Sequence, residues 1–235
     1  MLTFALDTST QSPSLAVTHG GRLVGELLLG PDPGAGRRVL EGAHHLLAAC
    51  GIDITDIERI VVGVGPGGFT GLRIGLATAD GLGQALGRPV VGAGSLEALA
   101  LGLAETVAPG AVVVPAHDAR RSELFAAAYR VSGDGSLDEL IAPLAIPAGD
   151  LGVRLGPLVA AGQTVVAAGT GALVGQAVLR AAGVDIPPER AAVHRLRAAA
   201  LVTRVDAGAG RQAVPIYARL PDAEVNRLRA AEAAS

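Results

Sequence analysis

The segment 63–75 reads GVGPGGFTGLRIG, and six of its thirteen residues are glycine. Such density is costly, because a glycine loses more conformational freedom on folding than any other residue. The apolar run IERIVV precedes the segment, and residues 69–86 follow it with the apolar spacing of a helix rich in small side chains. We therefore predict a buried strand, a tight glycine turn and a largely buried helix in succession.

The first interpretation of these glycines is a nucleotide-binding turn. The pattern Gly63-x-Gly65-x-x-Gly68 matches a dinucleotide-binding fingerprint between a strand and a helix. It does not follow the first strand, no acidic residue stands about twenty residues on, and Pro66 lacks an amide that could face a phosphate. A Walker phosphate loop is excluded because the chain contains no lysine. The fingerprint is therefore a weak signal.

The second interpretation is a packing surface along the predicted helix. Small residues recur there at every fourth position, namely Gly71, Gly75, Ala79, Gly83 and Gly87. This spacing places them in one row on a helix, where another backbone can approach closely. The row serves either close packing on the chain's own sheet or the docking of a second subunit, and apolar residues such as Leu72 flank it.

The composition is typical of a folded protein with little attraction for nucleic acid. Half of the residues are apolar, 17% are charged and the net charge is −3, so the overall field does not favour phosphate backbones. The single Cys50 excludes an internal disulfide and suggests a reducing compartment. The N-terminus lacks a signal-peptide pattern, and Pro157 with five glycines interrupts the uncharged run 155–179. We expect a cytoplasmic protein without a membrane span.

The remaining pattern predicts two α/β halves, each opening with a β-hairpin. In the first half we expect a strand from residue 2, a hairpin turn at 19–22, a strand at 89–94, and helices at 37–50, at 69–86 and after Ser95 as N-cap. In the second half we expect strands at 111–119, 123–131 and 163–168, a proline-rich connector at 141–157, and helices at 172–182 and 199–205. The predicted halves are residues 1–107, joined by a C-terminal helix at about 221–235, and residues 108–220.

Four segments of the chain resemble the TsaB (YeaZ) family. They are the glycine segment 63–75, ALDTST at 5–10, AVPIYAR at 213–219 and AHDARRSELFAAAY at 116–129. The resemblance implies an actin/hexokinase/Hsp70-like (ASKHA) α/β fold with two βββαβα-type halves around a cleft. It further implies a partner subunit in bacterial tRNA threonylcarbamoyladenosine synthesis, related to the glycoprotease M22 family.

The resemblance also bears on catalysis. The catalytic paralogue, TsaD, carries a His-x-x-x-His metal pair on the helix that corresponds to the one beginning at Ser95. Here Ser95 and Leu99 occupy the two ligand positions, and neither could hold a transition metal. The chain also lacks the His-Glu-x-x-His pattern of a zinc peptidase. We therefore expect no catalytic residues and no metal site.

A vestigial nucleotide site is the next expectation. ATPases of this fold place phosphate and adenosine contacts after the first strand of each half and at a later turn. The matching residues here are Asp7, Thr8, Ser9, Asp118, Gly169, Thr170 and Gly171. An alternative is that Asp7 caps its own turn and that the GTG turn only begins a helix.

Two functional hypotheses follow. In the first, the chain is a non-catalytic scaffold that forms a heterodimer with a TsaD-like subunit, meets a TsaE-like ATPase, reaches tRNA only through the complex, and forms a homodimer when alone. It has no cofactor of its own, and ATP or ADP binds only in the complex. Its expected partner interface comprises Gly71, Leu72, Gly75, Leu76, Ala79, Leu82, Gly83, Val39 and Leu46. In the second, the chain is an independent ATPase or small-molecule kinase that uses Asp7 and Asp118.

Overall fold

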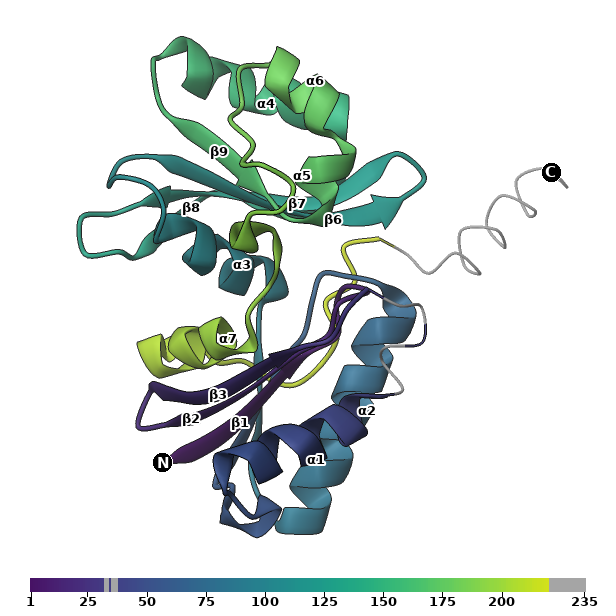
Figure 1. Ribbon diagram of the computed structural model, residues 1–235. Helices are drawn as coiled ribbons and strands as arrows, with labels where there is room; N and C mark the ends of the chain where they lie inside the picture. The colour runs from purple at the N-terminus through teal and green to yellow at the C-terminus, as the bar shows by residue number, and fades with distance from the viewer. Residues whose placement is uncertain (32–33, 35–37, 220–235) are drawn as a thin grey trace, which may run out of the picture.

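The computed structural model describes residues 1–31, 34 and 38–219, and it contains two sheets that stand one above the other (Figure 1). The first sheet has the strand order β3-β2-β1-β4-β5. Strands β1, β2 and β3 form an antiparallel meander, and β4 and β5 continue the sheet parallel to β1. The strands are β1 (Leu2–Asp7), β2 (Ser14–His19), β3 (Arg22–Leu28), β4 (Arg59–Gly63) and β5 (Val90–Ala93).

The second sheet repeats this plan with the order β8-β7-β6-β9. Its antiparallel meander again precedes a parallel strand, because β9 pairs parallel with β6. Beyond β9, Asp185 makes a single parallel bridge to Val166, where the first half has its fifth strand. The strands are β6 (Val112–Arg120), β7 (Glu123–Val131), β8 (Leu137–Pro147) and β9 (Val165–Ala168). The predicted hairpins and the two-half α/β plan are confirmed.

Helices cover both faces of each sheet. Figure 1 shows α1 and α2 on the outer face of the first sheet and α7 on its inner face, while α4, α5 and α6 cover the outer face of the second sheet and α3 its inner face. The helices are α1 (Val39–Cys50), α2 (Phe69–Leu86), α3 (Ser95–Ala104), α4 (Ala148–Ala160), α5 (Thr170–Val174), α6 (Gln176–Ala181) and α7 (Ala198–Arg204). Single 3₁₀ turns are η2 (Ile54–Asp56) and η3 (Ala192–His194), and η4 (Val205–Ala209) is a π-helical segment that follows α7 directly. No helix in the described residues is long and apolar enough to cross a membrane.

The alternation of side chains along β1 explains why its two faces hold different helices. Phe4 and Leu6 point to the face covered by α1 and α2, whereas Ala5 points to the face covered by α7. Successive side chains of a strand point to opposite faces, so large residues fill the outer layer and alanine leaves room for a closely packed inner helix. The amide of Ala198 at the start of α7 donates to the Ser14 hydroxyl of β2 at 2.8 Å.

The inner helices are exchanged relative to the halves expected from the sequence. Helix α3 precedes the expected boundary, yet its Leu96 and Leu103 pack in the core of the second sheet. Helix α7 belongs by sequence to the second half, yet it packs on the first sheet. The chain after α7 stays there, because the amide of Ile216 donates to the Val64 carbonyl at 2.8 Å. The expected terminal helix at 221–235 lies outside the described residues.

One buried carboxylate joins the two inner helices. Glu97 of α3 accepts a hydrogen bond from the Arg204 side chain of α7 at 2.9 Å and one from Arg211 at 2.6 Å. Both arginines contact a glutamate that is 8% exposed, so the charge is compensated where water is scarce. Removing Glu97 would leave both guanidinium groups without their acidic partner, and breaking a buried ion pair is destabilising. The Glu97–Arg204 ion pair therefore links α3, which packs on the second sheet, to α7, which packs on the first.

Two local predictions are wrong. Ser95 does not cap α3, because Gly94 is the N-cap and Ser95 is the first helical residue, with its side chain turned inward. The expected connector at 141–157 is instead the end of β8 and most of α4. Proline suggested a loop there, but β8 is an edge strand, where a missing amide is tolerated, and Pro147 stands at the N-cap of α4.

The row of small residues on α2 packs inside the chain from Gly71 to Gly83, whereas Gly87 is the exposed C-cap that follows the helix. A Cβ added at Gly71 or Gly75 would collide with Thr8, and one at Gly83 would collide with Val90. Ala79 is fully buried. Of the other residues expected at a partner interface, Leu72, Leu76, Val39 and Leu46 are also buried, and Leu82 packs against the same core. The expected interface is corrected accordingly: these side chains seat α1 and α2 on their own sheet.

Two glycines of α2 provide a matched test of this packing. Gly75→Ala places a methyl group against the Thr8 hydroxyl, and we expect it to lower the free energy of unfolding by about 1–3 kcal/mol. Gly81 has nothing within 4 Å of the added carbon, so Gly81→Ala should raise the free energy of unfolding by about 0.5–1 kcal/mol through helix propensity. Urea titrations followed by circular dichroism measure both. Equal effects of the two substitutions would contradict the packing described.

Candidate functional site

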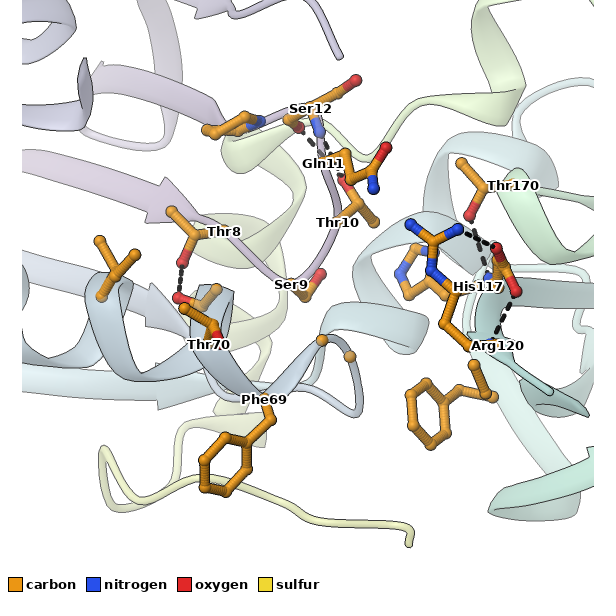
Figure 2. A pocket seen from close by; sticks show the side chains of 18 of the residues that line it. Thr8, Ser9, Thr10, Gln11, Ser12, Phe69, Thr70, His117, Arg120 and Thr170 are labelled. Carbon is orange, nitrogen blue, oxygen red and sulfur yellow. Dashed lines mark hydrogen bonds and ion pairs between the residues drawn. The ribbon is translucent and has the colours of Figure 1, made fainter. Parts of the chain in front are cut away.

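A cavity of about 920 Å³ lies between the two halves. Its walls come from the loop after β1, the glycine turn before α2, the end of β6 and the segment 217–219. Figure 2 shows Ser9 and Phe69 on the side of the first half and His117, Arg120 and Thr170 on the side of the second. Because equivalent first strands of the two halves end here, residues far apart in the sequence share one cleft.

Asp7, at the end of β1, is turned away from this cavity into the protein. Its Oδ1 accepts hydrogen bonds from the Ser9 amide at 2.8 Å and the Ser9 hydroxyl at 2.6 Å. Its Oδ2 accepts one from the Ser95 hydroxyl at 2.6 Å, and Ser95 in turn accepts from the Gly65 amide at 3.0 Å. Both carboxylate oxygens therefore have interior partners, and Asp7 joins β1 to α3 and the glycine turn.

The density of glycine at 63–75 is explained by the backbone that leaves β1. A Cβ at Gly63 would collide with the Asp7 carboxylate, and a Cβ at Gly67 would collide with Ser9. The Gly68 amide donates to the Ser9 carbonyl at 2.8 Å. The turn thus surrounds residues 7–9 of its own chain, and the amide of Gly68 is not directed at a ligand.

The end of β6 holds a second carboxylate in a different setting. Asp118 Oδ1 accepts from the Arg120 amide at 2.8 Å, and Oδ2 pairs with the Arg120 guanidinium at 3.3 Å. The Asp118 amide donates to the Thr170 hydroxyl at 3.1 Å. Gly169 and Gly171 flank that threonine, and a Cβ on either would meet the backbone of β6. These two glycines bring α5 close to the sheet.

The seven residues expected at a nucleotide site are therefore only partly together. Four of them line the cavity: Thr8, Ser9, Asp118 and Thr170. The other three are Asp7, Gly169 and Gly171, which face the interior and are not among the lining residues. The structure supports the alternative for Asp7, since its side chain caps its own turn through Ser9.

The two positions that correspond to the metal pair of the paralogue are buried. Ser95 is fully buried and donates to Asp7, and the Leu99 side chain, 2% exposed, lies against Gly169. Within the described residues, no group of three or more His, Cys, Asp or Glu side chains could hold a metal ion. At these two positions the side chains serve packing and hydrogen bonding.

His117 is a site residue that the sequence analysis missed. Its ring lines the cavity while the side chain is only 3% exposed, and neither ring nitrogen has a hydrogen-bond partner. Burial lowers the pKa of His117 to about 4, and the negative charge of Asp7 opposes part of this shift. The ring is therefore neutral at physiological pH. The available signal was a histidine in a strand whose other residues from 112 to 116 are apolar and buried.

An aromatic cluster at the start of α2 was also missed. The Arg73 guanidinium lies 3.9 Å from the centroid of the Phe69 ring, and its Nε donates to the Tyr217 hydroxyl at 3.3 Å. The two rings are 5.2 Å apart. Tyr217 comes from the segment after α7, which reaches α2 only because it returns to the first half. Nothing in the local sequence of either segment indicates this contact.

The pKa of His117 predicts a pH dependence of stability. In the unfolded chain the histidine pKa is about 6.5, so between pH 6.5 and pH 4 the unfolded state binds more protons than the folded state. We therefore expect the free energy of unfolding to be highest above pH 6.5 and to fall by about 3 kcal/mol as the pH is lowered towards 4.

His117→Leu should remove this part of the pH dependence, whereas substitution of the exposed His45 by glutamine should not. Urea unfolding at a series of pH values between 7 and 4 provides the comparison. A His117→Leu variant whose stability falls as steeply as that of the unaltered chain would show that the buried ring is not responsible.

Curated relatives share this sequence over part of its length. The chain is 34% identical over 136 residues to the tRNA threonylcarbamoyladenosine biosynthesis protein TsaB of Escherichia coli, which is 57% of this chain and 58% of that protein. It is 30% identical over 141 residues to the Bacillus subtilis protein of the same name, or 60% of each. The chain thus spans less than two thirds of the length of the curated relatives that it matches.

Solved structures match over nearly the whole chain. YeaZ from Pseudomonas aeruginosa superposes with a TM-score of 0.71 at 27% identity, covering 92% of this chain and 99% of that one. The ethanolamine utilization protein EutJ from Carboxydothermus hydrogenoformans has a TM-score of 0.51 at 15% identity, covering 86% and 90%, and shows the fold alone. Together with the repeated strand order, these likenesses confirm the actin/hexokinase/Hsp70-like fold class.

The model of one protein family matches residues 37–157, slightly more than half of the chain. That family is described as TsaD, tRNA N6-adenosine threonylcarbamoyltransferase. The match includes the glycine turn, α2, α3 and the first hairpin of the second half. With the TsaB and YeaZ likenesses, it follows that the chain belongs to the TsaD family and, within it, to the TsaB (YeaZ) group.

Proposed function

We propose that this chain is a non-catalytic accessory subunit that supports a TsaD-like subunit in threonylcarbamoyl transfer to a tRNA adenosine. Two of the relatives are named as tRNA threonylcarbamoyladenosine biosynthesis proteins, and the matching family model is that of the transferase itself. In this proposal the transfer chemistry belongs to the partner, and the present chain supplies a surface on which the partner is held.

The non-catalytic role rests on the side chains at the two metal-pair positions. The Ser95 hydroxyl donates a hydrogen bond to Asp7, and Leu99 has no atom that can bind a metal. A metal-dependent reaction at these two positions would therefore need ligands from another polypeptide. The alternative, an independent ATPase or kinase, would use the carboxylates of Asp7 and Asp118. Both oxygens of Asp7 already accept hydrogen bonds from Ser9 and Ser95, which argues against that alternative.

The observation that carries the docking proposal is the outer face of α1 and α2. The two helices lie side by side on the first sheet (Figure 1), and their outward residues include Leu40, which is 56% exposed. On α2, Ala77, Gly81 and Ala85 are exposed and recur at every fourth position. They form a second row of small residues, two positions away from the buried row. A partner helix could approach this row closely, while Leu40 supplies apolar area beside it.

The other partners enter the proposal through the same assembly. When the chain is alone, this face would pair with the same face of a second copy, because an isologous contact buries it on both molecules. A TsaE-like ATPase and tRNA would meet the complex, and ATP or ADP would bind only there. We place the complex in the cytoplasm.

Gly81→Arg tests the docking face. The substitution adds a long charged side chain at a point with no neighbour within 4 Å, so the fold should be kept while close approach of a partner is blocked. We expect a loss of association of at least tenfold with a TsaD-like subunit, measured by calorimetry, and an unchanged circular dichroism spectrum.

Gly149→Arg is the matched control, since Gly149 is an exposed glycine of α4 with equally open surroundings. It should bind the partner as the unaltered chain does. If Gly81→Arg retained full affinity, the partner would have to dock elsewhere.

A further inference from the structure

A second cavity, of about 560 Å³, lies at the opposite end of the first sheet from the cleft. The cleft is lined by residues that follow β1, whereas the second cavity is lined by Thr18 and Leu23, beside the start of β1, where Leu2 pairs with His19. Its other walls come from the C-terminal part of α3, from α7, and from the segments 131–135 and 192–197. Figure 1 shows α3 and α7 facing each other between the two sheets. We call this space the back cavity, and it shares no lining residue with the cleft in the described part of the chain.

The back cavity exists because the two inner helices carry small side chains where they face it. Its lining includes Ala98, Gly102 and Ala104 of α3, and Ala199 and Ala200 of α7. A Cβ added at Gly102 would meet nothing within 4 Å. Leu23 lines the same cavity and is 47% exposed, so a large apolar side chain stands uncovered there. Apolar walls of this kind favour an occupant that removes them from water.

A buried hydroxyl without a partner faces this space. Ala16 points to the inner face of the first sheet, towards α7, and Thr18 follows two positions later on the same face. Thr18 is 2% exposed, and its Oγ1 has no hydrogen-bond partner among the described residues.

The neighbouring hydroxyls of this face are both in use. Ser14 accepts from the Ala198 amide at 2.8 Å, and Thr3 accepts from the Arg59 side chain at 3.2 Å. Buried polar groups in native proteins are almost always hydrogen-bonded. The Thr18 hydroxyl therefore indicates a polar group on the molecule that fills the back cavity.

The charged residues of the back cavity balance one another. Arg195 and Glu105 line it and are exposed, so each can remain in water. Arg197 also lines it, but its Nε donates to the Glu26 carboxylate at 2.8 Å. The lining thus has no excess of either sign to compensate a charged ligand, and a charge placed among the alanines would lose its hydration. The expected occupant is uncharged.

We propose that the back cavity binds an uncharged, mainly aliphatic molecule with one hydrogen-bonding group. The aliphatic part lies against α3, α7 and Leu23, and the polar group reaches the Thr18 hydroxyl. The volume of the cavity lies within the usual range for small-molecule sites. The proposal goes beyond the accessory role and does not depend on it, because every residue in it belongs to this chain and none lies on the outer face of α1 and α2.

Four probes of graded chemistry test the proposal on the full chain. They are 1-octanol, the shorter 1-butanol, the anion octanoate and the cation octylamine. Saturable shifts of amide resonances in α3 and α7 measure binding by nuclear magnetic resonance. We expect one 1-octanol to bind per chain, at least tenfold more tightly than 1-butanol, because each buried methylene group adds to the affinity. Octanoate and octylamine should bind at least threefold more weakly than 1-octanol.

A matched pair of glycine substitutions locates the site. Gly102→Leu places a side chain in the cavity without a clash, so we expect the fold to be kept and 1-octanol to bind at least tenfold more weakly. Gly156→Leu is the control, because Gly156 is a half-buried glycine of α4 with equally open surroundings and lines neither cavity. It should bind 1-octanol as the unaltered chain does, and circular dichroism checks both folds.

Thr18→Val removes the hydroxyl and keeps the shape of the side chain. We expect it to weaken 1-octanol about threefold through the lost hydrogen bond and to leave the fold intact. Unchanged binding in Thr18→Val or in Gly102→Leu would overturn the proposal, and so would tighter binding of octanoate or octylamine. Gly81→Arg should not alter the affinity for 1-octanol, which separates this site from the docking face.

Discussion

The buried carboxylate of Asp7 is the interaction on which the rest of the structure depends. It lies at the end of β1, where the first sheet, the glycine turn and α3 meet, and it binds Ser9 and Ser95. Such a charge is costly to bury without hydrogen bonds, so its partners must stay in place. The glycines around it follow from the same requirement, because side chains at 63 and 67 would displace the carboxylate or Ser9. A motif that resembles a ligand-binding loop therefore serves the chain's own backbone.

The exchange of the inner helices connects the two halves. Helix α3 is continuous with the first sheet but packs on the second, and α7 does the reverse, so the chain passes between the halves twice. Glu97 joins the two helices through Arg204 and Arg211. The cleft on the other side of this connection is consequently formed by segments from both halves and by residues 217–219. We propose the outer face of α1 and α2 as the surface on which another polypeptide docks.

Local patterns predicted some features well and others poorly. The helix over 69–86 was located correctly, because its spacing of apolar residues is independent of the rest of the fold. Two rows of small residues run along this helix, and the sequence did not predict which of them faces the core. The row that contains Gly75 lies against Thr8, and the other row faces solvent. Prolines at 143 and 147 suggested a loop because an edge strand and a helix N-cap tolerate proline equally well. His117 was overlooked because burial, which lowers its pKa, is a property of the packed cleft.

The sequence by itself determined the two-half plan, the hairpins, the helix after the glycine turn and the family, because these depend on patterns that neighbouring residues carry. It also determined that Ser95 and Leu99 offer no metal pair, since that depends on side-chain chemistry alone. Only the tertiary structure decided which row of α2 is buried, where α3 and α7 pack, and which polar residues face the cleft. Those features arise from contacts between residues distant in the chain, such as Asp7 with Ser95 and Arg73 with Tyr217. The spacing of apolar and polar residues within one segment does not indicate such contacts.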